Sequence, residues 1–309
     1  MVKTFKFYNN FIIQSQHKGS IILIGNFDGL HLGHQKLLRL AKIFKKKYSL
    51  KIGVLTFEPM PKMFFNKGLK NFRISNQNQK SNYLKKLNVD FLITKTFDKK
   101  FSKTKSIDFI TKILKKKLNP KFIFVSDNFR FGNKREGDVK QLIKYEKIYN
   151  YKIIKPQPLV VGKKVVSSSL IRNYLQNGKL KIANNLLNRN WSIEGKVQKG
   201  RQIGKKIGFP TANIDIQNYI LACPGVYAVR AKMIKGTKFI KGIANLGYRP
   251  TFNGKKILLE VHLFNFSGNL YNKYLFVEFL KFIRKEKKFK NGDQLKKQIK
   301  IDLLKAKKI

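Results

Sequence analysis

The sequence predicts an α/β protein in two parts: a parallel sheet wrapped by helices, then a small antiparallel β-barrel with a terminal helix. Its 309 residues suit two domains that each bury a core. Up to about residue 174, short apolar runs alternate with helix-like stretches, which is typical of a parallel sheet. After Trp191 the chain has strand-like segments broken by Gly and Pro, which favours a barrel.

The N-terminal part contains five apolar runs that we expect to be strands. They are 21–24, 52–57, 91–94, 122–125 and 153–154. Between the first two runs, Leu37, Ala41, Phe44 and Tyr48 recur at helical spacing, so a helix is expected there.

The C-terminal part contains four expected barrel strands and one helix. The strands are 225–231, 239–246, 257–264 and 275–283. In the helix, 293–307, we expect Leu295, Ile299, Leu303 and Leu304 to share one face. The boundary is expected near 187–190, after a helix that Gly178 ends, so the predicted domains are 1–187 and 188–309.

The chain carries a formal net charge of +51, from 67 Lys and Arg against 16 Asp and Glu. Such a charge can indicate a nucleic-acid partner. Only ten of these cations are Arg, and the lysines are spread along a chain rich in Asn, Ile and Phe, as an AT-rich genome would encode. With no zinc, homeodomain or RNP-type signature, we do not expect nucleic acid to be the main partner.

A single cysteine, Cys223, excludes an intramolecular disulfide and a multi-cysteine metal site. The N-terminal residues lack the apolar core of a signal peptide, and no later run approaches a membrane span. A cytoplasmic protein without a membrane partner is therefore expected. The sequence predicts no oligomeric state.

The segment 25–34, GNFDGLHLGH, lies between an expected buried strand and an expected amphipathic helix. Open α/β sheets bind ligands in such loops, and backbone amides at a helix start favour phosphate. Glycines allow close approach of a nucleotide, while His31 and His34 can donate hydrogen bonds as charge develops on phosphate oxygens. The alternative is a pair of ordinary cap or surface histidines.

The segment resembles the HxGH nucleotidyltransferase superfamily, and the whole string resembles its prokaryotic FAD synthetase branch, which implies a Rossmann-like domain that adenylylates FMN. Two further segments are similar to that family: TFEPMP at 56–61 and SSSLIR at 167–172. The resemblance implies that His31 and His34 are catalytic. It implies that the following residues bind ATP: Gly25, Asn26, Phe27, Asp28, Gly29, Gly33, Ser167, Ser168, Ser169 and Arg172. A plain N-cap is the alternative for the serines.

A third segment, 125–132, resembles the GxDFxFG motif of the family but has Ser126 for Gly and Asn128 for Asp. We interpret it as a variant loop. The resemblance implies an FMN or substrate loop made of Pro59, Pro61, Asn128, Phe129, Arg130 and Gly132.

The second module contains GRQIG at 200–204 and GFPTAN at 208–213. Pro210 fixes a backbone angle, and Thr211 and Asn213 supply oxygens of the type that Mg²⁺ prefers. A Gly-Pro turn between strands is the alternative.

The string GFPTAN is similar to riboflavin kinases, and the similarity continues through 225–227, GIANLGYRPTF at 242–252, EVHLF at 260–264 and FIR at 282–284. Together the resemblances cover nearly the whole chain, in the order of the prokaryotic bifunctional riboflavin kinase/FMN adenylyltransferase family. They imply ATP or flavin contacts in the kinase at Gly200, Arg201, Gly208, Pro210, Ala212 and Arg284, with Mg²⁺ on Thr211 and Asn213.

Period-two alternation places four residues on one strand face: Leu258, Glu260, His262 and Phe264. A carboxylate among apolar neighbours is unfavourable unless it has a partner, so Glu260 is a candidate functional residue. The resemblance implies that Glu260 is the base that accepts the proton of the riboflavin 5′-hydroxyl. Glu278 is a competing carboxylate. The expected reactions use ATP and Mg²⁺ to convert riboflavin to FMN, and ATP to convert FMN to FAD. The rivals are a single-activity kinase with a drifted first module and a basic binding protein.

Overall fold

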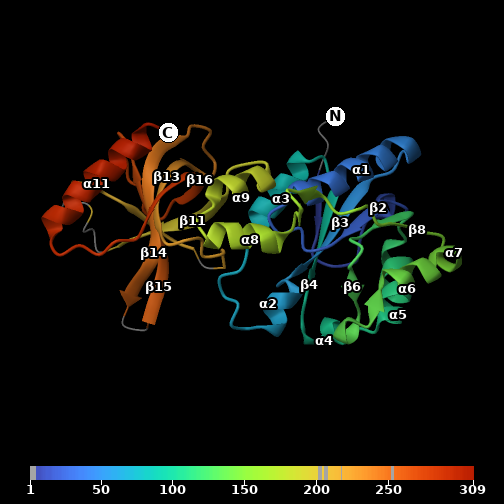
Figure 1. The fold of residues 1–309 in the computed structure, drawn as a ribbon. Helices are drawn as coiled ribbons and strands as arrows, with labels where there is room; N and C mark the ends of the chain where they lie inside the picture. The colour runs from blue at the N-terminus through green and yellow to red at the C-terminus, as the bar shows by residue number, and fades with distance from the viewer. Residues whose placement is uncertain (1–4, 201–203, 205–207, 217, 252–253) are drawn as a thin grey trace. The chain divides into compact units, whose positions relative to one another are not determined.

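The computed structural model describes residues 5–200, 204, 208–216, 218–251 and 254–309, which form two compact units. The first contains residues 1–69 and 77–166, and the second contains residues 70–76 and 167–309. Figure 1 shows the parallel sheet of the first unit and the barrel of the second. The predicted α/β class with a parallel sheet, a C-terminal barrel and a terminal helix is confirmed.

The first unit has a six-stranded parallel sheet in the order β1-β4-β3-β2-β5-β8. The strands are β1 Lys6–Tyr8, β2 Ile21–Ile24, β3 Ile52–Glu58, β4 Phe91–Thr96, β5 Phe122–Phe124 and β8 Lys152–Ile154. All five expected strands are present, and the short β1, which lacks a long apolar run, was not predicted. In the sheet, β3 and β4 lie on one side of β2, and β5 and β8 lie on the other. The end of β2 is therefore a topological switch point, where open sheets bind ligands.

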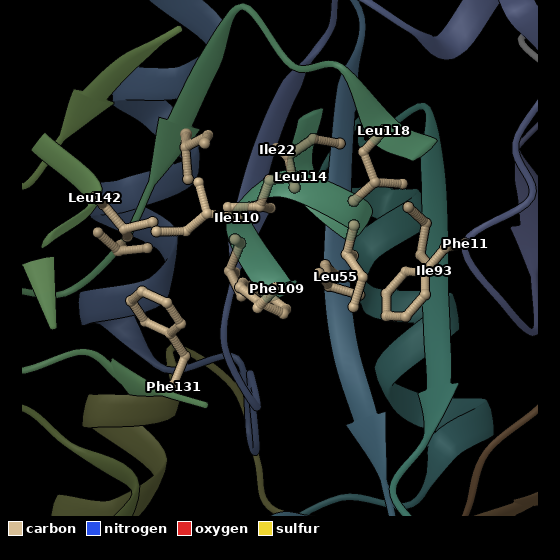
Figure 2. Close-up of a cluster of buried hydrophobic side chains, with 14 of the residues drawn as sticks. Phe11, Ile22, Leu55, Ile93, Phe109, Ile110, Leu114, Leu118, Phe131 and Leu142 are labelled. Carbon is tan, nitrogen blue, oxygen red and sulfur yellow. The ribbon is translucent and has the colours of Figure 1, made fainter. Parts of the chain in front are cut away.

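Helices cover both faces of this sheet because each face carries apolar side chains that must be buried. Helix α1, Leu32–Tyr48, packs Leu38 and Ala41 on Ile21 and Leu23. On the other face, the π-helical segment η2, Phe109–Leu118, packs its apolar side. Figure 2 shows Phe109, Ile110, Leu114 and Leu118 of η2 together with Ile22, Leu55 and Ile93 of the sheet. Apolar side chains are thus buried on both faces of the sheet, in one cluster under each layer of helices.

The remaining elements of the first unit are short. The helical ones are η1 Ser15–His17, α2 Pro61–Phe65, α3 Gln77–Lys86, α4 Lys99–Ser102, α5 Ser106–Asp108, η3 Asn133–Arg135, α6 Val139–Lys144 and α7 Glu146–Tyr149. Two hairpins pair β6 Arg130–Phe131 with β7 Gly137–Asp138, and β9 Val160–Val161 with β10 Lys164–Val165.

The second unit is a closed antiparallel barrel in the order β11-β12-β15-β14-β13-β16. Its strands are β11 Ser192–Gln198, β12 Ala212–Asp215, β13 Gly225–Met233, β14 Ile240–Thr251, β15 Gly254–Leu263 and β16 Tyr274–Lys285. The four expected strands are β13 to β16. On β15 the buried residues are Leu259, Val261 and Leu263, so the predicted alternation is confirmed and Glu260 lies on the opposite face.

Three helices belong to the second unit: α8 Ser168–Gln176, α9 Leu180–Leu187 and α11 Gly292–Lys307. Helix α11 packs on β13 and β14 through a cluster that includes Val226, Ile243, Leu303 and Ala306. The expectation for Leu304 was wrong, because that side chain is 62% exposed. A helix advances 100° per residue, so Leu303 and Leu304 cannot both point to one narrow contact.

The segment 70–76 joins the second unit although its neighbours in sequence belong to the first. Phe72 and Arg73 donate backbone hydrogen bonds to the Asn218 carbonyl, and Ile220 donates to the Arg73 carbonyl. The buried indole of Trp191 donates to the Ile74 carbonyl at 3.0 Å.

Within the described residues, no helix is long and apolar enough to cross a membrane.

Candidate active sites

The predicted nucleotide loop follows β2 at the switch point of the sheet. Phe27, Gly29 and Leu30 have φ values of 47°, 78° and 42°. Phe27 and Leu30 are each 1% exposed and belong to the core beneath α1. Two apolar side chains therefore anchor a left-handed, strained backbone, a conformation that persists only where the surroundings enforce it and that is common at functional sites.

The two histidines of this loop stand together at the start of α1. His31 is the N-cap residue and His34 lies in the first turn. Their rings are stacked with centroids 3.8 Å apart, and the ring of Phe27 lies 4.9 Å from that of His34. The two histidines, three residues apart in the sequence, thus meet in the fold beside the backbone amides of a helix N-terminus.

Gly33 permits this close stacking. A Cβ atom at residue 33 would lie 3.1 Å from the His31 ring and 3.2 Å from the Val166 carbonyl oxygen. In the neighbouring strand β3, the buried Thr56 hydroxyl donates to the Asn26 carbonyl at 3.3 Å, and the buried Lys80 ammonium donates to Thr56 at 3.4 Å. Among the other predicted ATP residues, Asp28 is 2% exposed, and Gly25, which follows β2, donates its N–H to the Leu55 carbonyl at 3.1 Å.

A small aromatic pocket of about 130 Å³ lies in the same unit. Basic residues line it beside the rings, and the predicted substrate-loop residues Pro61, Phe129, Arg130 and Gly132 contribute to it. Its aromatic residues are Phe57, Phe65, Phe97, Phe101, Phe109, Phe129 and Phe131, and its basic residues are Arg130, Lys134 and Arg135. Pro59, also predicted, does not line it. Sequence reasoning missed Phe97 and Phe101, because they lie in a segment without a motif.

Ser126, Asp127 and Asn128 of the variant loop are exposed and bonded both within the loop and to residues that follow it. Ser126 Oγ donates to Asn128 Oδ1 at 2.9 Å, and Asp127 forms an ion pair with Lys155 at 3.1 Å. Arg130 lies 3.5 Å from Asp138. Asn128 and Asp127 line a second, more open depression with Lys140 and Lys155.

The serine-rich segment begins helix α8 of the second unit. Ser167 is the N-cap residue, and its hydroxyl accepts the Leu170 N–H at 3.2 Å, so the capping interpretation holds for this serine. Ser168 and Ser169 occupy the first turn. Arg172 is 8% exposed, its Nε donates to the Phe72 carbonyl at 2.8 Å, and its guanidinium lies 3.7 Å from the centre of the Phe72 ring. Arg172 therefore fastens segment 70–76 within its unit.

The barrel carries a cavity of about 650 Å³. Strand β15 contributes Glu260 and His262, and β14 contributes Asn245. Helix α11 closes another side with Leu295, Ile299 and Asp302. Thr211 and Arg284, two predicted kinase residues, also line it. Arg201 lies outside the described residues.

Strand register brings the predicted metal ligand and base together. Asn213 on β12 is the direct partner of Glu260 on β15, and Asn245 on β14 is the partner of Glu260 on its other side. Gly200 makes room for the Asn213 amide, because a Cβ at residue 200 would lie 2.2 Å from Asn213 Nδ2. Sequence reasoning did not single out Asn245, although the string GIANLGYRPTF contained it.

The turn before β12 is held by His262. Its Nδ1 lies 2.8 Å from the Pro210 carbonyl oxygen. A carbonyl only accepts, so Nδ1 carries the hydrogen and the tautomer is defined. Gly208 has a φ of +88°, and Ala212 is paired with Val261. The rival base Glu278 instead forms an ion pair with Arg230, with Nε and Oε2 2.6 Å apart, and it does not line the cavity.

A nucleotide-type sheet with a His-x-Gly-His loop at its switch point, followed by a barrel whose strand pairing sets a cavity carboxylate between two asparagines, defines a two-module nucleotide-dependent transferase. The comparisons with known proteins agree with this class. The family model described as FAD synthetase matches residues 13–170, and the model described as riboflavin kinase matches residues 187–309. The chain belongs to the family of bifunctional riboflavin kinase/FMN adenylyltransferases.

Several curated relatives carry that name, among them the following two. The protein of Buchnera aphidicola subsp. Schizaphis graminum is 42% identical, covering 93% of each chain. The protein of Haemophilus influenzae is 39% identical, covering 94% of each chain. A crystal structure titled as a macrolide-efflux protein from Streptococcus pneumoniae has a TM-score of 0.84 and 29% identity, covering 96% of this chain and 97% of that one. The predicted family, its two enzyme activities and the order of the modules are confirmed.

Proposed function

We propose that residues 188–309 phosphorylate riboflavin at Glu260, and that residues 1–187 adenylylate the resulting FMN at the loop containing His31 and His34. The single observation that carries the proposal is the register of the barrel: Glu260, in the wall of a cavity of about 650 Å³, is the direct strand partner of Asn213. That volume suits a small-molecule substrate.

In the kinase module, Glu260 is the proposed general base. It accepts the proton of the riboflavin 5′-hydroxyl while that oxygen bonds to the γ-phosphorus of ATP, and ADP leaves with the electrons of the broken P–O bond. Asn213, Asn245 and the His262-held turn at Pro210 orient the groups around this carboxylate. Glu278 pairs with Arg230 and does not line the cavity, whereas Glu260 does, which supports the choice of Glu260.

Residues of this module fit a Mg²⁺ ion. Asn213 is 6% exposed, and its Oδ1 atom is buried with no hydrogen-bond partner among the residues that the structure describes. An amide oxygen in that state suits a hard cation, and the hydroxyl of Thr211 nearby in sequence is of the same type. We propose these two residues as the ligands. When bound, Mg²⁺ would neutralise charge on the transferring phosphoryl group.

In the adenylyltransferase module, an FMN phosphate oxygen attacks the α-phosphorus of ATP and pyrophosphate leaves. His31 and His34 donate hydrogen bonds to the charged oxygens, together with the amides that open α1. The aromatic pocket with Arg130, Lys134 and Arg135 supports flavin binding there, because an apolar ring system stacks on aromatic side chains and a phosphate pairs with cations.

Incubation of the purified chain with riboflavin, ATP and Mg²⁺, followed by chromatography of the flavins, tests the proposal. We expect both FMN and FAD. The variant loop at Ser126 and Asn128 supports a second candidate, a chain with the kinase activity alone, which would yield FMN without FAD. A binding protein without enzyme activity would yield neither.

The proposed partners are small molecules: riboflavin, FMN and ATP. We propose no nucleic-acid or membrane partner for either reaction. A cytoplasmic location is part of the proposal, supported by the single cysteine and by the substrates of the two reactions.

A further inference from the structure

Asp302 of helix α11 is a buried carboxylate in the wall of the kinase cavity, and the proposed reaction does not use it. Its side chain is 1% exposed. Oδ2 accepts from Arg284 Nε at 2.8 Å and lies 2.7 Å from Arg284 Nη2, while Oδ1 accepts from Gln298 Nε2 at 3.0 Å. Burying an ion pair costs desolvation free energy, and apolar residues of similar volume in its place are often at least as stabilising. The stability of the fold is therefore a weak reason for this buried ion pair, and a functional role is the alternative.

The geometry limits what Arg284 can do. A guanidinium has five N–H donors in a rigid plane. Within the described part of the chain, two donors bond to Asp302, and Nη1 donates to the Lys285 carbonyl at 2.9 Å. One donor on each Nη atom can therefore serve an acceptor in the cavity that Arg284 lines.

The carboxylate of Asp302 also balances the positive charge of Arg284, so the pair has no net charge. The cations Lys287 and Lys288 at the same cavity are exposed to solvent, whereas the side chain of Arg284 is 20% exposed. A neutralised, orientated guanidinium is suited to the carbonyl oxygens of an uncharged ring. It is less suited to a phosphate, which favours a cation with its full charge.

We propose that Asp302 is a positioning residue for riboflavin: it holds and neutralises Arg284 so that the guanidinium donates to the carbonyl groups of the flavin ring and not to ATP. This inference rests on the proposed kinase function. It also gives α11 a role, because Leu295 and Ile299 lie on the same side of the cavity and offer apolar surface to the ring.

The test uses the full chain with Asp302→Asn. Riboflavin is fluorescent, so its Kd is measured by quenching without turnover. Without the carboxylate, Arg284 is no longer held toward the flavin ring, so the riboflavin Kd and KM should rise about tenfold or more. The KM for ATP and the kcat at saturating riboflavin should stay within about threefold of wild type, the pattern of lost ground-state binding. Asp293→Asn, an exposed aspartate on the same helix, is the matched control and should change neither constant.

A merely structural role gives a different result. Partial unfolding lowers the active fraction, and so kcat, while the riboflavin KM stays at the wild-type value; that result would overturn the inference. FAD formation from supplied FMN reports on the other module of the same molecules. If wild type forms no FMN, the proposed function itself fails. Should Asp302→Asn not fold, Arg284→Lys replaces it: a raised riboflavin KM supports the inference, and an unchanged one overturns it.

Discussion

Ser126 and Asn128 are hydrogen-bonded to each other, with Ser126 Oγ donating to Asn128 Oδ1 at 2.9 Å. These are the two positions where the loop departs from the pattern GxDFxFG. The bond explains how the two departures can coexist. The hydroxyl of Ser126 donates to the amide oxygen of Asn128, which stands where the pattern has a carboxylate oxygen. In this loop a neutral hydrogen-bonded pair, Ser126 and Asn128, therefore stands where the pattern has a glycine and a charged aspartate.

Asn128→Asp should restore that charge. A carboxylate accepts charge-assisted bonds, roughly twice as strong as neutral ones, from a substrate or from nearby cations. We expect a lower KM for FMN or ATP in FAD synthesis with little change in kcat, measured by steady-state kinetics. Asp127→Asn is the matched test of the neighbouring carboxylate, which pairs with Lys155. If only Asp127→Asn alters FAD synthesis, Asp127 supplies the missing group, and if neither does, this loop does not bind substrate.

Glu260→Gln should abolish riboflavin phosphorylation. The amide keeps the shape between Asn213 and Asn245 but cannot accept the proton, and loss of a general base slows turnover about 10²- to 10⁴-fold. FAD formation from supplied FMN by the same variant is the internal control and should remain nearly normal. Kinase turnover within a few-fold of wild type would assign the base elsewhere, and Glu278→Gln would then be measured.

His31→Ala and His34→Ala should show the reciprocal pattern. Each removes one donor to a charged transition state, which is worth roughly 3 to 4 kcal/mol, or about a hundred- to thousandfold in the rate of FAD formation. Phosphorylation of riboflavin should be unchanged, since its residues lie in the other unit. A normal yield of FAD from FMN and ATP with either variant would contradict the role of that histidine.

The stability of the first unit should fall below neutral pH because of His17. Burial, followed by the charge of Lys51, lowers the pKa of His17 below its usual 6.5. Its Nδ1 lies 2.6 Å from the Tyr8 hydroxyl, its ring stacks on Phe91, and Lys6 and Asp90 are the other charged groups that act on it.

The folded chain thus favours the neutral imidazole. The contribution of His17 is complete above the unfolded pKa of 6.5 and is lost as the pH falls from there through the lower folded pKa. Between pH 7.5 and 5.5 the wild-type Tm should fall more than that of His17→Gln, whose side chain does not titrate. Equal shifts in the two proteins would show that other groups carry the pH dependence.

The sequence alone was enough for the class of fold and the order of the modules. Alternation and helical spacing report which side chains are buried, and the strands and helices they predicted are present. Resemblance to family strings, and not periodicity, implied the roles of Glu260, His31 and His34, because each lies within a short motif.

Only the tertiary structure decided how distant residues meet. Strand register placed Asn213 and Asn245 on either side of Glu260, and register depends on pairing between segments far apart in the chain. The tertiary structure also pairs Glu278 with Arg230, away from the cavity. It brings Arg172 to Phe72, 100 residues away in the sequence, and Asp302 of the last helix to Arg284. No local pattern reports such contacts, since the free energy that selects them comes from burial and charge pairing in the finished fold.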